Sequence, residues 1–202
     1  MARRSDHSPI ELRTLLIEAG HGLIEERGFA RFSAREAARR AGYTVGTIYH
    51  VFGSLDPYFM AINTSTNVLW TGALEQALAD CPADGDRIAV LVGAYFAFAE
   101  AHPNAWQALY DYRQPADLPL PEADVAERVK LTGIVDKEVA RELGREIDAD
   151  TRRLTRSLIA TAHGHCALHL SGNFALMQET DPLGQAIARV RESLAAIGSS
   201  SS

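Results

Sequence analysis

The chain has 202 residues, 47% hydrophobic and 23% charged, which is typical of a globular protein long enough to bury a core. No apolar run approaches the about 18 residues of a membrane span, and no apolar stretch follows the first arginines as in a secretory signal. Two cysteines without a C-x-x-C motif form no disulfide framework, so a cytoplasmic protein without membrane segments is expected. Residues 1–53 hold eight arginines and six acids, a balance of +2, so the remainder carries −8. This asymmetry is typical of a nucleic-acid contact module joined to an acidic body.

The first predicted helix runs from Pro9 to about Arg27. Proline suits the first helical position, and Gly28 suits the end of the helix. Phe29 and Phe32 follow, and we expect them to pack this helix against the next two. Its apolar residues recur at helical spacing: Ile10, Leu16, Ile17, Leu23 and Ile24.

Two short helices joined by a tight turn are predicted over residues 33–52. Ser33 and Glu36 have the spacing of a capping box, in which each residue binds the backbone N–H of the other. Gly42 stands where the chain needs a positive φ, and Thr44 can cap the second helix. Ile48, Val51 and Phe52 form the inner face of that helix. This order predicts a helix-turn-helix, whose second helix enters the DNA major groove.

The rest of the chain is also predicted to be helical. Further helices are expected over about 56–79, from 86 to before Pro103, over 104–113, 122–143 and 151–171, and from 182 to the end. No segment shows the sustained alternation of a strand. The sequence therefore predicts an all-α fold of about nine helices.

Part of the sequence is similar to a known family. The residues that carry the similarity are Glu26-Arg27-Gly28, Phe32-Ser33, Glu36-Ala37-Ala38, Ala41-Gly42, Thr44 through Tyr49, and Phe52. In this combination residues 10–62 resemble the DNA-binding domain of the tetracycline-repressor (TetR) family. Ala162-His163-Gly164, followed by Leu168 and Ser171-Gly172, resembles a C-terminal subtype of that family marked by His-Gly.

The resemblance implies a homodimeric transcriptional regulator, usually a repressor. We expect no enzymatic activity and no cofactor. Its partners would be palindromic double-stranded DNA, a small-molecule effector and a second copy of the chain. The effector would change the separation of the two recognition helices. The domains expected are a helix-turn-helix domain at 1–53, a helical ligand-binding and dimerisation domain at 54–198, and a disordered tail at 199–202.

The resemblance also implies roles in DNA binding, carried over by position. Ser33 would bind phosphate, and Tyr49 and His50 would contact the DNA backbone. The residues facing the major groove would be Thr44, Val45, Gly46 and Thr47. Arg3 and Arg4 would reach the minor groove, as basic arms do in other helix-turn-helix proteins. Leu55 stands where the family usually has a phosphate-binding lysine, and Arg35, Arg39 or Arg40 could compensate.

An aromatic set could line the effector pocket or simply fill the core. The set consists of Trp70, Tyr95, Phe96, Phe98, Trp106 and Tyr110. The residues we expect at the pocket are Trp70, Phe96, Trp106 and Tyr110. Tryptophan needs a partner for its N–H and is rarely a simple filler, which favours Trp70 and Trp106. His163 could donate a hydrogen bond to an organic ligand.

The last two long helices carry apolar stripes. On the first stripe lie Leu154, Leu158, Ala162 and Leu168, and on the second lie Leu183, Ile187, Val190 and Leu194. Two such helices from each subunit would form a four-helix dimer interface. The alternative is packing within one subunit.

Two other functional classes remain open. His165, Cys166 and His169 share helix faces and could hold zinc or nickel with His102 or Glu100, which would make a metal sensor of the same fold. Leu55 leaves room for a helical enzyme or binding protein with a weakened DNA module. Catalysis has little support, because the chain has no nucleophile elbow, phosphate loop or H-E-x-x-H motif.

Overall fold

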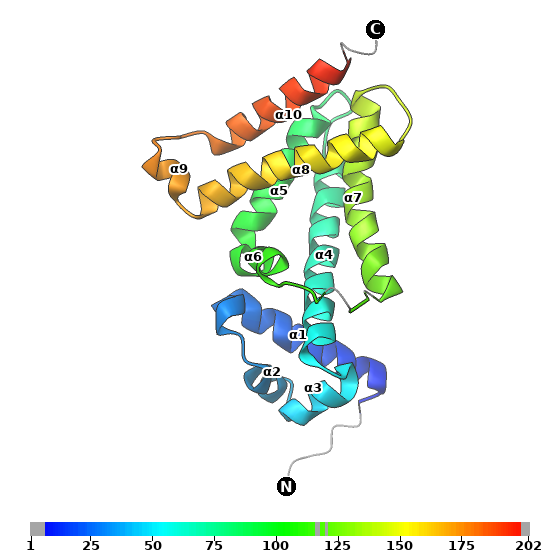
Figure 1. The fold of residues 1–202 in the computed structure, drawn as a ribbon, viewed down its shortest axis with the longest axis vertical. Coiled ribbons are helices and arrows are strands. Elements are labelled where there is room, and N and C mark those ends of the chain that lie inside the picture. Colours follow the sequence, from blue (N-terminus) through cyan, green and yellow to red (C-terminus); the bar gives the residue numbers. More distant parts are fainter. Residues whose placement is uncertain (1–6, 116–117, 120, 199–202) are drawn as a thin grey trace. The chain divides into compact units, whose positions relative to one another are not determined.

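The computed structural model describes residues 7–115, 118–119 and 121–198, and every regular element in this part of the chain is helical, which confirms the predicted all-α class (Figure 1). The elements are α1 (Pro9–Arg27), the short 3₁₀ helix η1 (Phe29–Arg31), α2 (Ala34–Arg40), α3 (Val45–Phe52), α4 (Leu55–Ala79), α5 (Arg87–Ala101), α6 (Pro103–Asp111), α7 (Glu122–Glu142), α8 (Ala149–Leu170), α9 (Asn173–Leu176) and α10 (Pro182–Gly198). None of the described helices has a stretch long and apolar enough to span a membrane. The short helix α9, which follows Gly172 at φ 75°, was not predicted.

The capping box lies at the start of α1 rather than at the start of α2. Ser8 N–H donates to Glu11 Oε2 at 2.7 Å, and Glu11 N–H donates to Ser8 Oγ at 3.3 Å. At α2, Glu36 N–H donates to Ser33 Oγ at 3.4 Å, but the Glu36 carboxylate accepts from Arg39. Only one of the two hydrogen bonds of the predicted capping box at Ser33 is therefore formed, because the Glu36 carboxylate accepts from Arg39 and not from the backbone N–H of Ser33.

Other helix ends differ from the prediction by one or two residues. Helix α4 begins at Leu55, one residue before the predicted start at about residue 56. Helix α8 begins earlier than expected because Asp148, not Asp150, is its cap and accepts from Thr151 N–H at 2.7 Å. Helix α10 begins as predicted, since Asp181 Oδ1 accepts from the backbone N–H of its first turn at 2.9 Å.

The described chain forms two compact units. Unit 1 contains the chain up to Leu69 together with His102–Arg128, and unit 2 contains Trp70–Ala101 together with the chain from Val129. Helix α6 therefore belongs with the helix-turn-helix, although about fifty residues separate the two in sequence.

The core of unit 1 joins α1, α2 and α3 to the first half of α4. Its buried residues are Leu16, Leu23, Ile24, Ala37, Ala38, Ile48, Phe52, Tyr58, Ala61, Ile62 and Ala108. Phe29 and Phe32 pack against this core as predicted, and the ring centroids of Phe32 and Phe59 lie 4.8 Å apart. Helix α6 is bound to α1 through Glu25, whose carbonyl accepts from Asn104 Nδ2 at 2.8 Å and whose carboxylate lies 2.7 Å from His102 Nδ1.

Unit 2 is built on the packing of α5, α8 and α10. Helix α5 buries a nearly continuous apolar surface, as predicted, and α8 and α10 each bury one stripe. Arg87 of α5 donates to Glu138 of α7 at 2.6 Å and also to the carbonyl of Leu78. This half-buried ion pair links α5 to the part of α7 that belongs to unit 2.

Candidate DNA interface and ligand-binding region

Helix α3 has a buried face and an exposed face. Ile48 is fully buried and Phe52 is 8% exposed, so these residues attach the helix to the core of unit 1. Gly42 has φ 82°, as predicted, and brings the chain into the turn before α3. On the opposite face Thr44, Gly46, Tyr49 and His50 are exposed, and Val45 and Thr47 are half-buried. The residues expected to face DNA therefore share the surface that the core leaves open.

The arginines of α2 differ in how far they are neutralised within the protein. Arg39 Nη2 lies 2.7 Å from Glu36, and Arg40 Nη2 lies 2.5 Å from Glu26. The hydrogen bond from Arg39 lowers the pKa of Glu36 to about 2, so this carboxylate stays charged and paired. Arg35 is exposed and makes no ion pair with any described residue. Arg35 is therefore the arginine of α2 that no described acid neutralises.

Leu55 and His7 lie near the helix-turn-helix. Leu55 packs against the core of unit 1, where a lysine would instead carry its charge to the surface. His7 Nδ1 lies 2.8 Å from the Tyr43 hydroxyl, which places the start of the described chain beside the turn of the helix-turn-helix. Arg3 and Arg4 lie outside the described residues.

An aromatic cluster in unit 2 contains two of the residues expected at an effector pocket. The Trp70 ring lies parallel to Phe98, with centroids 5.2 Å apart, and meets Tyr95 edge-on at 4.9 Å. The Tyr95 hydroxyl is 3.0 Å from His163 Nδ1, and burial lowers the pKa of His163. Side chains of α4, α5 and α8 are thus connected through Tyr95.

The other three residues expected at the pocket lie elsewhere. Phe96 is buried, and its ring faces His169 at a centroid distance of 6.0 Å. Trp106 and Tyr110 belong to unit 1, where their rings pair at 5.2 Å. The structure therefore brings Trp70 and His163 together and leaves Trp106 and Tyr110 in the other unit.

Two family models match the chain. Residues 16–56 match the bacterial regulatory proteins of the tetR family, and residues 88–190 match the tetracyclin repressor-like C-terminal domain. The chain belongs to the TetR family. It is accordingly a transcriptional regulator with a helix-turn-helix DNA-binding domain and a ligand-binding C-terminal domain, as the resemblance implied. The His-Gly subtype stays a prediction.

Solved structures share the fold of this TetR-family chain at low sequence identity. A protein of unknown function from Rhodococcus sp. RHA1 is 23% identical, with a TM-score of 0.71 over 96% of this chain and 98% of that one. A tetR-family regulator from Streptomyces coelicolor is 19% identical, with a TM-score of 0.67 over 97% and 85%. The regulator FadR from Bacillus subtilis, in complex with stearoyl-CoA, is 15% identical, with a TM-score of 0.63 over 90% and 97%. A comparison with curated proteins gave no match.

The leucine stripes of this TetR-family chain pack mainly within one subunit. Leu154 is 9% exposed in the single chain, Leu158 4%, Val190 3% and Leu194 4%. Helices α8 and α10 pack against each other and against α5 within one chain, so intramolecular packing, the alternative considered above, is sufficient to bury these four residues. Leu168, Leu183 and Ile187 are half-buried and remain partly accessible.

The histidines near the end of α8 have other partners than a metal. His165 Nδ1 lies 2.9 Å from the Thr161 carbonyl, and His169 Nε2 lies 2.9 Å from Glu100 Oε1. Cys166 is fully buried, and its burial raises the thiol pKa to about 12. Among the described residues, no three His, Cys, Asp or Glu side chains are grouped so that they could hold a metal ion.

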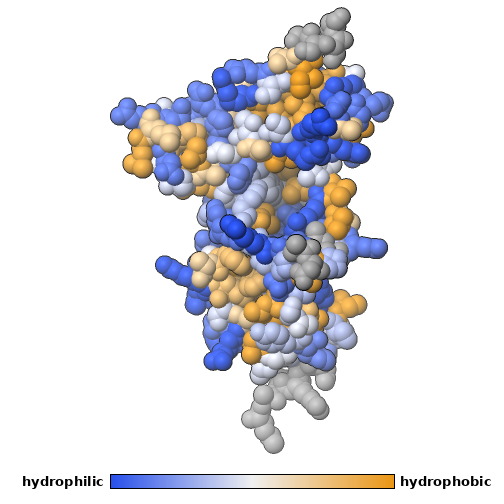
Figure 2. All heavy atoms as spheres, viewed as in Figure 1, coloured by the Kyte–Doolittle hydropathy of each residue, from blue (hydrophilic) through white to orange (hydrophobic). Residues whose placement is uncertain are grey.

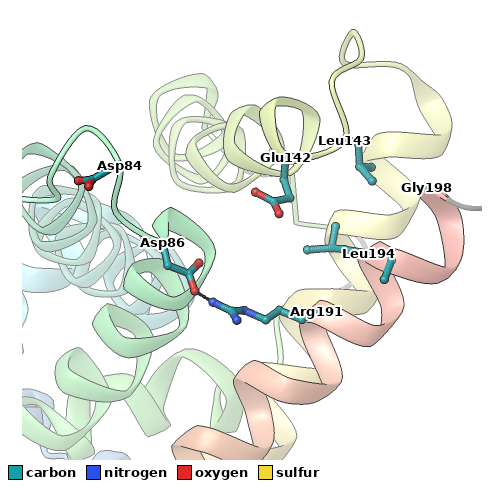
Figure 3. Close-up of a pocket in the computed structure, with 8 residues that line it drawn as sticks. Asp84, Asp86, Glu142, Leu143, Arg191, Leu194 and Gly198 are labelled. Carbon is teal, nitrogen blue, oxygen red and sulfur yellow. Dashed lines mark ion pairs between the residues drawn. The ribbon is translucent and has the colours of Figure 1, made fainter.

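A surface cavity of about 630 Å³ lies in unit 2, and no residue of the aromatic cluster lines it (Figure 3). Arg191 points toward Asp86 across it, and the two form an ion pair. Its lining residues are Asp84, Asp86, Glu142, Leu143, Arg191, Leu194, Ala195 and Gly198. None of the five expected pocket residues lines this cavity, and its charged rim is mostly acidic.

One feature of α4 was missed from the sequence. Asn63 is 3% exposed, Thr66 1%, Asn67 6% and Thr71 1%, although all four are polar. Their spacing of three and four residues places them on one face of the helix. The signal in the sequence is the recurrence of polar residues at helical intervals, and spacing alone does not show that this face is buried.

Proposed function

We propose that this TetR-family chain is a homodimeric repressor that binds a palindromic operator and leaves it when a small organic molecule binds to its C-terminal domain. The exposed face of α3 carries this proposal. That face presents small and hydrogen-bonding side chains, while Ile48 and Phe52 hold the helix rigidly on the core. Side chains on such a rigid helix can read the base edges of the major groove.

In this proposal the exposed residues of the helix-turn-helix divide into two groups. Thr44, Val45, Gly46 and Thr47 face the base edges, because they form the first turn of α3. Contacts to phosphate come from Ser33, Arg35, Tyr49 and His50, with Arg3 and Arg4 in the minor groove. Phosphate contacts fix the position of the protein, whereas base contacts select the sequence.

Dimerisation follows from the need to read two half-sites. Two recognition helices must lie about 34–36 Å apart, or a multiple of that distance, on a palindrome. The half-buried Leu168, Leu183 and Ile187 are the parts of the expected interface that one subunit leaves accessible. Hydrophobic residues also reach the surface around α9, where Leu176 is 83% and Met177 66% exposed (Figure 2). Exposed apolar groups next to one another favour association with a second copy.

Release by an effector requires a difference in affinity. A ligand shifts the equilibrium toward the state that it binds more tightly, and by no more than that difference. That FadR of the same fold was solved with stearoyl-CoA supports an organic effector for the C-terminal domain of this chain.

Footprinting on the DNA upstream of its own gene tests the proposal. At low salt and without added ligand, the chain should protect a palindrome and reduce transcription from that promoter in vitro. Replacing Thr47 and His50 by alanine should abolish protection, because both side chains lie on the DNA-facing side of α3. Lys137→Ala in α7 removes an exposed side chain of unit 2 and serves as the control that keeps protection.

Absence of any protected palindrome would contradict the proposal. Protection that survives the loss of Thr47 and His50 would contradict the assigned face. Increased transcription from the protected promoter would contradict the repressor role.

A further inference from the structure

We infer that the effector is an uncharged, planar aromatic molecule with a hydrogen-bond acceptor, and that it binds inside unit 2 against Trp70, Thr71 and Thr155. This inference rests on the proposed function, because it names the class of molecule to which the regulator responds. It differs from the expected pocket by adding two threonines and by excluding charged ligands.

Four side-chain polar atoms of unit 2 are buried and lack a hydrogen-bond partner among the described residues. Three of them are uncharged, Trp70 Nε1, Thr71 Oγ1 and Thr155 Oγ1, and the fourth is Nε of Arg145, between α7 and α8. Trp70 is 6% exposed, and each threonine is 1% exposed. Buried polar groups in native proteins are nearly always paired, so each such group calls for a partner. A ligand acceptor would take the N–H of Trp70, and the hydroxyls can both donate and accept.

Other threonines in helices of this chain show that these hydroxyls had a local alternative. The hydroxyls of Thr64, Thr66 and Thr161 donate to the carbonyl four residues earlier, at 2.9, 3.4 and 3.0 Å. This bond is open to any threonine within a helix. Thr71 and Thr155 do not form it, although both are buried. Their hydroxyls therefore remain available to a molecule inside unit 2.

The aromatic cluster favours a planar ligand. Phe98 lies against one face of Trp70 with an interplanar angle of 2°, and Tyr95 meets the ring at 71°. Stacked and edge-to-face contacts of this kind are the arrangements that aromatic rings prefer. A planar aromatic molecule extends the same packing while its acceptor reaches Trp70 Nε1.

The buried faces of α5 and α8 carry no charged side chain, and this favours an uncharged ligand. The buried residues described for α5 and α8 include no Asp, Glu, Lys or Arg. His163 faces the Tyr95 hydroxyl, and its lowered pKa keeps the ring neutral at pH 7. Arg87 and Glu138 neutralise each other. Against the buried faces of α5 and α8 a charged ligand would therefore lack a counter-ion, which is strongly unfavourable.

Three probes of nearly identical shape separate these requirements: benzamide is neutral, benzoate is an anion, and benzamidinium is a cation. Trp106→Phe leaves Trp70 as the one remaining tryptophan of the two in the chain, so its fluorescence reports on the site. Benzamide should shift the emission of Trp70 saturably and bind at least about tenfold more tightly than either charged probe. A tenfold ratio corresponds to about 1.4 kcal/mol.

Matched threonine variants locate the probe. In the Trp106→Phe background, Thr71→Val and Thr155→Val should each weaken benzamide binding about fivefold, whereas Thr66→Val should leave it unchanged, because the Thr66 hydroxyl is already bonded. Thermal unfolding checks the same assignment without a ligand. Thr71→Val and Thr155→Val should raise the midpoint because they remove an unpaired hydroxyl, and Thr66→Val should not.

The inference is overturned if benzamide shows no saturable binding, if a charged probe binds as tightly, or if the Thr71 and Thr155 variants bind benzamide like the parent. Tight benzamidinium binding would instead assign the acidic cavity of Figure 3. Binding is measured without DNA, so the two proposals fail separately. Benzamide binding without a protected operator refutes the proposed function and keeps the site. Operator release by benzoate or benzamidinium alone keeps the proposed function and refutes the site.

Discussion

Gly20 and Gly22 of α1 offer the same substitution with opposite expected effects. A Cβ at Gly20 would overlap the Tyr58 hydroxyl and come within 2.5 Å of Ile62 Cδ1, whereas a Cβ at Gly22 would meet nothing within 4 Å. The Tyr58 hydroxyl donates to the carbonyl of Leu16 at 2.6 Å, deep in unit 1. Gly20 thus lies where side chains of α4 contact the backbone of α1.

The expected magnitudes follow from that geometry. Alanine stabilises a helix interior by about 0.5–1 kcal/mol relative to glycine, and Gly22→Ala should gain this amount. Gly20→Ala gains the same, but overpacking costs about 1–3 kcal/mol. Loss of the Tyr58 hydrogen bond costs about 1–2 kcal/mol more. The net loss for Gly20→Ala is then about 1–4 kcal/mol, which separates the two variants by about 2–5 kcal/mol.

Urea unfolding followed by circular dichroism measures both variants against the parent. Operator binding reports whether the DNA-binding unit remains folded. If Gly20→Ala were as stable as Gly22→Ala, the Tyr58 ring would not be fixed against α1, and the packing argument would be wrong.

Three further predictions concern the DNA interface and the interior of unit 2. Arg35→Ala should flatten the dependence of log affinity on log salt concentration by about one unit in operator titrations, while Lys137→Ala leaves the slope unchanged. Thr44→Ala should change the free energy of unfolding by less than about 0.5 kcal/mol, because its side chain makes no capping bond, yet it should weaken operator binding; a large loss of stability would contradict this. Burial lowers the pKa of His163 below 6.5, so the unfolded state binds more protons as the pH falls through about 6.5, and the free energy of unfolding decreases there. His163→Gln should reduce that decrease between about pH 7.5 and 5.5 in urea titrations, and an unchanged decrease would refute the assignment.

The DNA-binding half of the fold could be predicted because its signals are local. Pro9 and Gly28 mark the ends of α1, and Gly42 takes the positive φ that its place between two helices requires. The capping box at Ser33 was half wrong for a reason that spacing cannot show. The Glu36 carboxylate accepts a charge-assisted hydrogen bond from Arg39, one turn away, which is stronger than a bond from the backbone N–H of Ser33.

Assignments that depend on what covers a helix face were harder to predict. The apolar spacing of Leu154 and Leu158 is the same whether the face meets another helix of its own unit or a second subunit. Trp70 and Trp106 look equivalent in the sequence, yet they lie in different units. Thr71 was missed because its unpaired hydroxyl is a property of the packed interior. The DNA, effector and dimer residues themselves remain predictions.

The contacts of Glu25 with His102 and Asn104 bear on how such regulators can be engineered. A chimera that joins the operator specificity of one regulator to the inducer response of another could be built with a single junction after the helix-turn-helix. In this chain such a junction would separate the helix-turn-helix from Ala108 of α6, which is 1% exposed and belongs to the core of unit 1. A working chimera would need two segments from the same parent, residues 1–69 and 102–128, so that unit 1 keeps helix α6.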